Sequence, residues 1–135
     1  MECESHILVI DDEEDLCWVL ENVLRSEGFT VTSVNNGKEA LACLTGQVFE
    51  VVFVDAKLPE LDGLTLAAMI RKQSPQTSII LISGFYYQED QAITEGIEKN
   101  LFNLFLAKPF DLEDIRLLAR QAVAWSREMK SCLNH

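Results

Sequence analysis

The sequence predicts an α/β fold in which the five strands of a doubly wound, parallel sheet alternate with five helices. Short apolar runs alternate along the chain with segments whose apolar residues recur every three or four positions, which is the spacing of one helix face. The expected strands are continuous apolar runs, as a parallel sheet covered on both faces requires. Right-handed crossovers between such strands leave only a few doubly wound strand orders.

The first half of the chain contains three of the expected strands, at residues 6–10, 29–33 and 51–54. Between the first two strands, apolar residues recur at helical spacing from position 16 to position 24, and Gly28 ends that helix. After the second strand, Asn36 and Glu39 form a capping-box pattern that begins the second helix. This half is therefore expected to fold as β-α-β-α-β.

The second half continues the alternation, with strands expected at residues 78–82 and 104–106. A third helix is expected over residues 64–70, and it must end before Pro75 because the residue before a proline disfavours helical geometry. A less regular fourth helix is expected around residues 89–98. The last helix has the clearest pattern, with Asp111 as its expected N-cap and an apolar face that continues to Met129.

The composition restricts the class of protein. With 135 residues, a single domain is expected over 1–135, with a core over about 5–125 and a helical extension over about 126–135. The four cysteines lack metal-ligand spacing, and no apolar run approaches the ~20 residues that span a bilayer. A reduced, cytoplasmic protein with no membrane contact is therefore expected. The net charge of −11 argues against direct nucleic acid binding and favours a divalent cation or a partner with a basic face.

Reactive side chains follow four of the five expected strands, at the sheet edge where open α/β folds place their sites. Asp11 and Asp12 follow the first strand, Asp55 the third, Ser83 the fourth and Lys108 the fifth. Carboxylates packed together repel one another unless a cation holds them, and oxygen-only ligands favour Mg²⁺. A carboxylate can attack a phosphoryl group, and a lysine can neutralise the transferring oxygens. Each residue alone has an ordinary structural explanation, but their combination predicts a Mg²⁺-dependent phosphoacceptor site at Asp55.

These residues make the chain resemble a response-regulator receiver domain of two-component signalling over about residues 5–125. The resemblance rests on four motifs, Ile7-Leu-Val-Ile-Asp-Asp-Glu13, Val54-Asp-Ala-Lys-Leu-Pro-Glu-Leu-Asp-Gly63, Leu81-Ile-Ser-Gly84 and Lys108-Pro-Phe110. It implies a flavodoxin-like (βα)5 fold with strand order 2-1-3-4-5. The chain departs from the family in one respect, because the stretch from Ser83 to Lys108, where the fourth helix is expected, is longer than is typical.

The resemblance assigns a role to each residue at the metal site. Asp55 would be the phosphoacceptor and a metal ligand. Asp12 would bind Mg²⁺ directly, Asp11 would bind it mainly through water, and the backbone carbonyl of Lys57 would be a further ligand.

Three further residues would carry the switch. Lys108 would pair with the phosphate, and its peptide bond to Pro109 would be cis. Ser83 would be the switch hydroxyl, and Phe105 would reorient beneath it when the domain is phosphorylated. The change would alter the face built from the fourth helix, the fifth strand and the fifth helix.

The implied function is a signalling switch rather than an enzyme, since the domain would catalyse only its own phosphorylation and dephosphorylation. The donor would be a phosphohistidine on a sensor histidine kinase, and a downstream output domain or protein would respond; a weak homodimer stays open. Two alternatives also remain open. An aspartyl-phosphate phosphohydrolase usually wants an acid two residues after its nucleophile, where Lys57 stands here. The other alternative is a receiver-like interaction module that does not switch.

Overall fold

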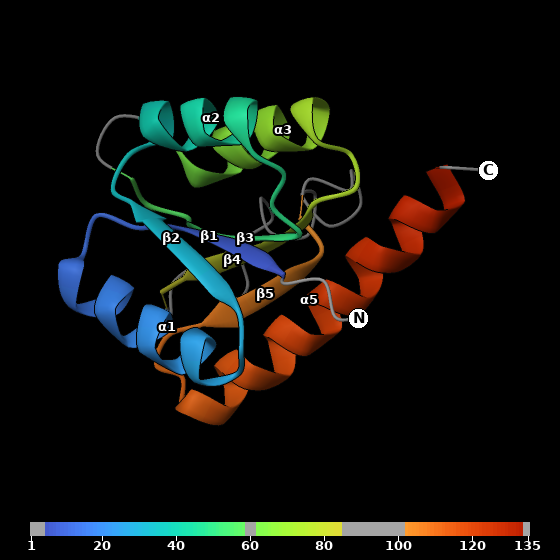
Figure 1. The fold of residues 1–135 in the computed structure, drawn as a ribbon. Helices are drawn as coiled ribbons and strands as arrows, with labels where there is room; N and C mark the ends of the chain where they lie inside the picture. The colour runs from blue at the N-terminus through green and yellow to red at the C-terminus, as the bar shows by residue number, and fades with distance from the viewer. Residues whose placement is uncertain (1–4, 59–61, 85–101, 134–135) are drawn as a thin grey trace.

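The computed structural model describes residues 5–58, 62–84 and 102–133, and its strands form a single parallel sheet (Figure 1). The strands are β1 (His6–Ile10), β2 (Thr30–Val34), β3 (Val51–Asp55), β4 (Ser78–Ser83) and β5 (Leu104–Ala107). Their spatial order is β2-β1-β3-β4-β5, and every neighbouring pair is parallel. The predicted doubly wound fold and strand order are therefore confirmed.

Helices cover both faces of this sheet. They are α1 (Glu14–Ser26), α2 (Gly37–Gly46), α3 (Gly63–Gln73) and α5 (Leu112–Leu133). In Figure 1, α2 and α3 lie on one face, and α1 and α5 lie on the other. The helix expected around residues 89–98 lies outside the described residues. Helix α5 runs to Leu133, four residues beyond the expected end of its apolar face at Met129. No helix in the described ranges combines the length and apolarity that a membrane crossing needs.

The strands read as continuous apolar runs because alternate residues serve two separate cores. In β1, Ile7 and Val9 pack with α1 and α5, whereas Leu8 and Ile10 pack with α2 and α3. All four side chains are fully buried. A strand covered on both faces cannot place a polar side chain along its middle without burying it. Polar residues therefore gather where the strands end.

The predicted helix ends have the expected local geometry. Gly28 follows α1 with φ of 96°, a backbone conformation that residues with a side chain rarely adopt. The Asn36 side chain accepts a hydrogen bond from the Glu39 backbone N–H at 2.8 Å. Asp111 and Asp114 cap α5 reciprocally, because each side chain accepts from the other's backbone N–H at 3.0 Å. These contacts satisfy N–H groups that a helix start otherwise leaves without partners.

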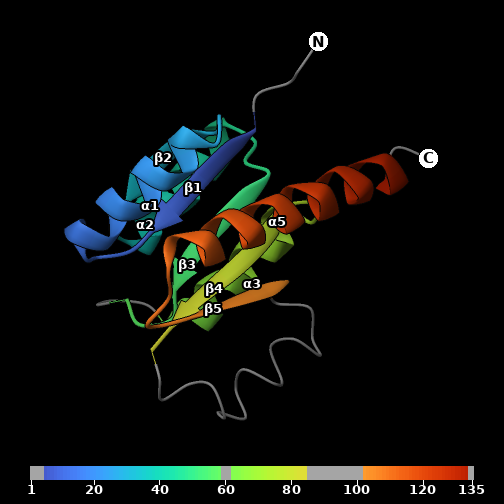
Figure 2. The same ribbon diagram turned by 90° about the horizontal axis from the view of Figure 1, so that it is seen from below.

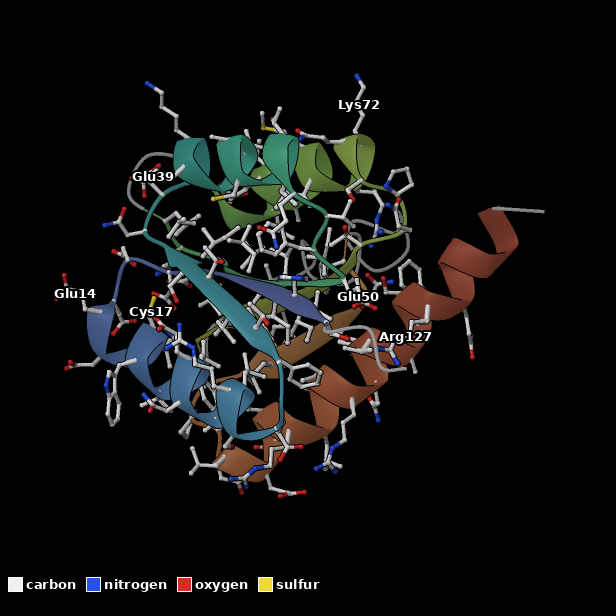
Figure 3. All side chains as sticks on the ribbon, in the orientation of Figure 1. Glu14, Cys17, Glu39, Glu50, Lys72 and Arg127 are labelled. Carbon is white, nitrogen blue, oxygen red and sulfur yellow. The ribbon has the colours of Figure 1, made fainter. Side chains whose placement is uncertain are left out.

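The second half of α5 is attached to the amino end of the sheet, opposite the carboxyl ends of the strands (Figure 2). Ser126 is buried and donates to the Gln76 carbonyl at 2.8 Å. Arg127 pairs with Glu50 at 3.2 Å and also donates to Ser5 (Figure 3). The first residues of the expected extension, 126–135, are thus packed against the body of the domain rather than standing apart from it.

Candidate functional site

The carboxyl ends of β1, β3, β4 and β5 bring the predicted site residues together. Asp11 follows β1, Asp55 is the last residue of β3, Ser83 is the last residue of β4, and Lys108 follows β5. Asp55 pairs with Ile82 across the sheet, one residue before Ser83. A pocket of about 360 Å³ opens at this edge, and its lining includes Asp55, Lys108 and Asp12.

Three carboxylates at this edge form a cluster. One oxygen each from Asp11, Asp12 and Asp55 lies within 4.8 Å of the others. Asp11 is 1% exposed and Asp55 is 5% exposed, while Asp12 is open to solvent. Two acids buried so close together are expected to repel, and each backbone contact that they make reduces this cost only in part.

The hydrogen bonds of the two buried acids leave one fully buried oxygen without a partner. Asp11 Oδ1 accepts from the Glu13 N–H at 2.9 Å, and Asp55 Oδ1 accepts from the Lys57 N–H at 3.1 Å. Asp11 Oδ2 is buried and has no hydrogen-bond partner among the described residues. A buried, unpaired carboxylate oxygen beside two other carboxylates is what a hard divalent cation needs. The residues present therefore fit Mg²⁺.

Burial also makes these acids harder to ionise. Desolvation raises the pKa of Asp11 to about 7, with a further increase from the Asp55 charge, and the Glu13 N–H opposes the shift. Desolvation likewise raises the pKa of Asp55, while the Lys57 N–H and the Lys108 ammonium hold it down. The hydrogen bonds and charges around Asp11 and Asp55 thus offset only part of the cost of ionising the two buried carboxyls. A divalent cation at the cluster would favour the ionised forms.

Lys108 reaches the site but is paired with a residue that the sequence did not single out. Its Nζ donates to Glu13 Oε1 at 3.0 Å. Its backbone N–H donates to the Ser83 carbonyl at 2.8 Å, and the Lys108–Pro109 peptide bond is cis, as the family resemblance implies. Glu13 belongs to an acidic run at a helix start, where acids are common. Nothing in the linear pattern distinguished it from its neighbours.

The predicted switch residues lie on adjacent strands. Ser83 is fully buried, and its Oγ donates to the Gly84 carbonyl at 3.2 Å. Phe105 is half-buried on β5, opposite Leu81, and packs against the core under α3. The structure places Phe105 one strand away from the acid cluster, with Ser83 at the end of the strand between them.

Gly63 contributes to the site through the space that it leaves empty. A Cβ at this position would lie 2.6 Å from Ala56 Cα and closer still to the Asp55 carbonyl oxygen. The Gly63 N–H also donates to the Ala56 carbonyl at 3.0 Å. The start of α3 therefore packs directly on the backbone that carries Asp55. The sequence places Gly63 within a motif, but it does not reveal the backbone contact that requires a glycine at this position.

A five-stranded doubly wound sheet with an acid trio and a lysine at its carboxyl edge defines a receiver-type α/β module. Comparison with known families agrees, because the model of the response regulator receiver domain matches residues 7–120. The chain belongs to this family.

Individual relatives support the same assignment. The DNA-binding transcriptional regulator NtrC of Salmonella typhimurium is 30% identical over 128 residues, which cover 95% of this chain and 27% of that protein. The chain thus spans about a quarter of the length of the curated relatives that it matches. Among solved structures, the receiver domain of NtrX from Brucella abortus has a TM-score of 0.81 at 32% identity, covering 87% of this chain and 98% of that one. The response regulator TrrA from Thermotoga maritima, in complex with Mg²⁺-BeF, has a TM-score of 0.76 at 26% identity, with the same coverage.

Proposed function

We propose that this domain is a Mg²⁺-dependent phosphoacceptor switch that receives a phosphoryl group on Asp55 from a phosphohistidine of a sensor histidine kinase. The observation that carries the proposal is the acid trio with its unpaired Asp11 oxygen. The other two acids, Asp12 and Asp55, line a pocket together with Lys108. The similarity to TrrA, whose structure holds Mg²⁺ and a beryllium fluoride, supports it. Membership of the receiver family supports the kinase donor.

Mg²⁺ would be held by Asp11, Asp12, Asp55 and the backbone carbonyl of Lys57, and when bound it would neutralise charge on the phosphoryl oxygens. Asp55 would attack phosphorus through a carboxylate oxygen while the bond from phosphorus to the donor histidine nitrogen breaks. The Lys57 N–H, which already donates to Asp55 Oδ1, orients the carboxylate for this attack.

Two donors would then hold the new phosphoryl group. Lys108 would pair with it through its ammonium, and Ser83 would rotate its Oγ away from the Gly84 carbonyl to donate to it. The present Ser83–Gly84 hydrogen bond is long for a hydroxyl donor, at 3.2 Å, so leaving it costs little.

The response would reach partners through the face that includes β5 and α5, together with the fourth helix that the sequence predicts. A pocket of about 420 Å³ lies on this face, lined in part by Phe105, Leu117 and Leu118. Space beside Phe105 would allow the ring to reorient when Ser83 moves. A downstream output domain or protein would read this change, and we propose a cytoplasmic setting with no direct nucleic acid contact by this domain.

Incubation with a small phosphodonor and Mg²⁺ tests the phosphoacceptor directly. Intact-mass measurement should show one added phosphoryl group on the wild type and none on Asp55→Asn. Removal of Mg²⁺ with a chelator should abolish the addition. Equal labelling of wild type and variant would exclude Asp55 as the acceptor.

Two further measurements separate this switch from the alternative functions. With an excess of small phosphoesters we expect no turnover, because Lys57 stands where a phosphohydrolase would carry its acid. With Mg²⁺ and beryllofluoride, we expect the NMR signals of Ser83 and Phe105 to shift. Unchanged signals would favour a non-switching interaction module.

A further inference from the structure

The Glu13 side chain holds the Lys108 ammonium at the rim of the acid pocket. Lys108 Nζ lies 3.0 Å from Glu13 Oε1, although 95 positions separate the two residues in the chain. Glu13 lines the same pocket as Asp55. Lys108 is near enough to Asp55 to lower that carboxyl's pKa, yet across the described ranges no hydrogen bond or ion pair joins the two. The ammonium is thus close to the acceptor but engaged elsewhere.

The backbones of Glu13 and Lys108 are each held by a hydrogen bond to another residue of the site. Only their side chains therefore need to move for the ion pair to break. The Glu13 N–H donates to Asp11 Oδ1 at 2.9 Å, and the Lys108 N–H donates to the Ser83 carbonyl at 2.8 Å. Glu13 is the N-cap residue of α1, but its side chain makes no capping hydrogen bond. The Lys108 and Glu13 side chains are 30% and 61% exposed. Both can rotate without disturbing the helix start or the strand end.

We infer that Glu13 is a positioning residue that competes with the phosphoryl group on Asp55 for the Lys108 ammonium; this inference rests on the proposed function. An exposed ion pair changes an equilibrium constant by only about two- to fivefold. A phosphoryl group brings a charge of about −1.5 to −2, and charge-assisted hydrogen bonds to it are worth about tenfold or more. Lys108 therefore transfers from Glu13 to the phosphoryl group, and Glu13 lowers the affinity for that group by about two- to fivefold.

Beryllofluoride binding at saturating Mg²⁺ tests this competition, because the anion mimics the phosphoryl group and saturation removes differences in metal affinity. Glu13→Gln should bind beryllofluoride about two- to fivefold more tightly than the wild type. Glu14→Gln is the matched control. It removes the same charge from the same helix start, but Glu14 is not part of the pocket lining and points outward from α1, whereas Cys17 faces the sheet (Figure 3). Its affinity should stay close to that of the wild type.

A double-mutant cycle separates competition from a general effect of charge. In a Lys108→Gln background, Glu13→Gln should no longer tighten beryllofluoride binding, because the contested ammonium is gone. Three results would each overturn the inference while leaving the phosphoacceptor proposal intact. The first is equal beryllofluoride affinity of Glu13→Gln and Glu14→Gln, and the second is weaker binding by Glu13→Gln than by the wild type. The third is a gain in affinity from Glu13→Gln that persists in the Lys108→Gln background. A wild type that bound no beryllofluoride with Mg²⁺ would instead overturn both proposals.

Discussion

Replacing Gly63 with alanine should damage both the stability of the domain and its acid site. The added Cβ would lie 2.6 Å from Ala56 Cα and 2.9 Å from the Asp55 carbonyl carbon, whereas real Cβ contacts stay beyond 3.0 Å. The obstructing atoms all belong to the backbone, so no side chain can rotate to relieve the overlap. Either the start of α3 or the segment that carries Asp55 must move.

The expected cost follows from these contacts. Forced overpacking costs about 1–3 kcal/mol, and loss of the hydrogen bond from the Gly63 N–H to the Ala56 carbonyl adds about 1 kcal/mol. Alanine restricts the unfolded chain more than glycine does, which offsets about 0.4–1 kcal/mol. We therefore expect the free energy of unfolding to fall by about 1–3 kcal/mol. A urea titration of Gly63→Ala followed by circular dichroism measures this change.

Gly46→Ala is the matched control for this substitution. Gly46 ends α2, and a Cβ there would meet no atom within 4 Å. The control should match the wild type or exceed its stability by up to about 1 kcal/mol. Because the overlap is with the Asp55 backbone, Gly63→Ala should also weaken Mg²⁺ binding, whereas Gly46→Ala should not. A Gly63→Ala variant with unfolding and Mg²⁺ binding equal to those of the wild type would refute the reasoning.

Three further substitutions test other contacts. Asp11→Asn should stabilise the metal-free protein by an amount that grows as the pH rises from about 4 to 7 and then levels off, in urea titrations with chelator. The unfolded carboxyl ionises near its ordinary pKa of 3.8, whereas burial raises the folded pKa to about 7, so the wild type loses stability between these two values; an equal gain at every pH would contradict this. Arg71→Met should lower the free energy of unfolding by about 3 kcal/mol, because it removes at least three hydrogen bonds and a ring contact to Trp125. The outward-pointing Lys72 is its control, and equal loss in Lys72→Met would refute this (Figure 3). Asp111→Ala should cost about 1 kcal/mol in thermal or urea unfolding by removing the cap of α5, and an unchanged midpoint would show that the cap contributes nothing.

The elements and the position of the site could be predicted because both follow from local pattern. Continuous apolar runs such as residues 6–10 mark strands covered on both faces, and polar residues can then stand only where those strands end. Asp55, Ser83 and Lys108 each follow such a run, and parallel strands bring their carboxyl ends to one edge. Linear order along the chain was therefore enough to place these residues at a common edge.

Contacts between distant side chains could not be predicted in this way. Arg71 joins the end of α3 to Asn103, before β5, and to Trp125 on α5, although the three residues are far apart in the chain. The spacing of apolar residues cannot predict such a contact, because it depends on how α3, β5 and α5 pack together. The same holds for the second half of α5, where Ser126 is buried and donates to the Gln76 carbonyl.

The sequence by itself determined the sheet, its strand order and the residues at its carboxyl edge. The spacing of apolar residues predicts the strands and helices, and the family motifs imply the strand order and identify the site residues. Only the tertiary structure decided how those residues engage one another. It paired Lys108 with Glu13, left Asp11 Oδ2 without a partner and set Gly63 against the Asp55 backbone. Distances of this kind are set by the packing of whole elements, whereas a sequence pattern reports only which face of an element is buried.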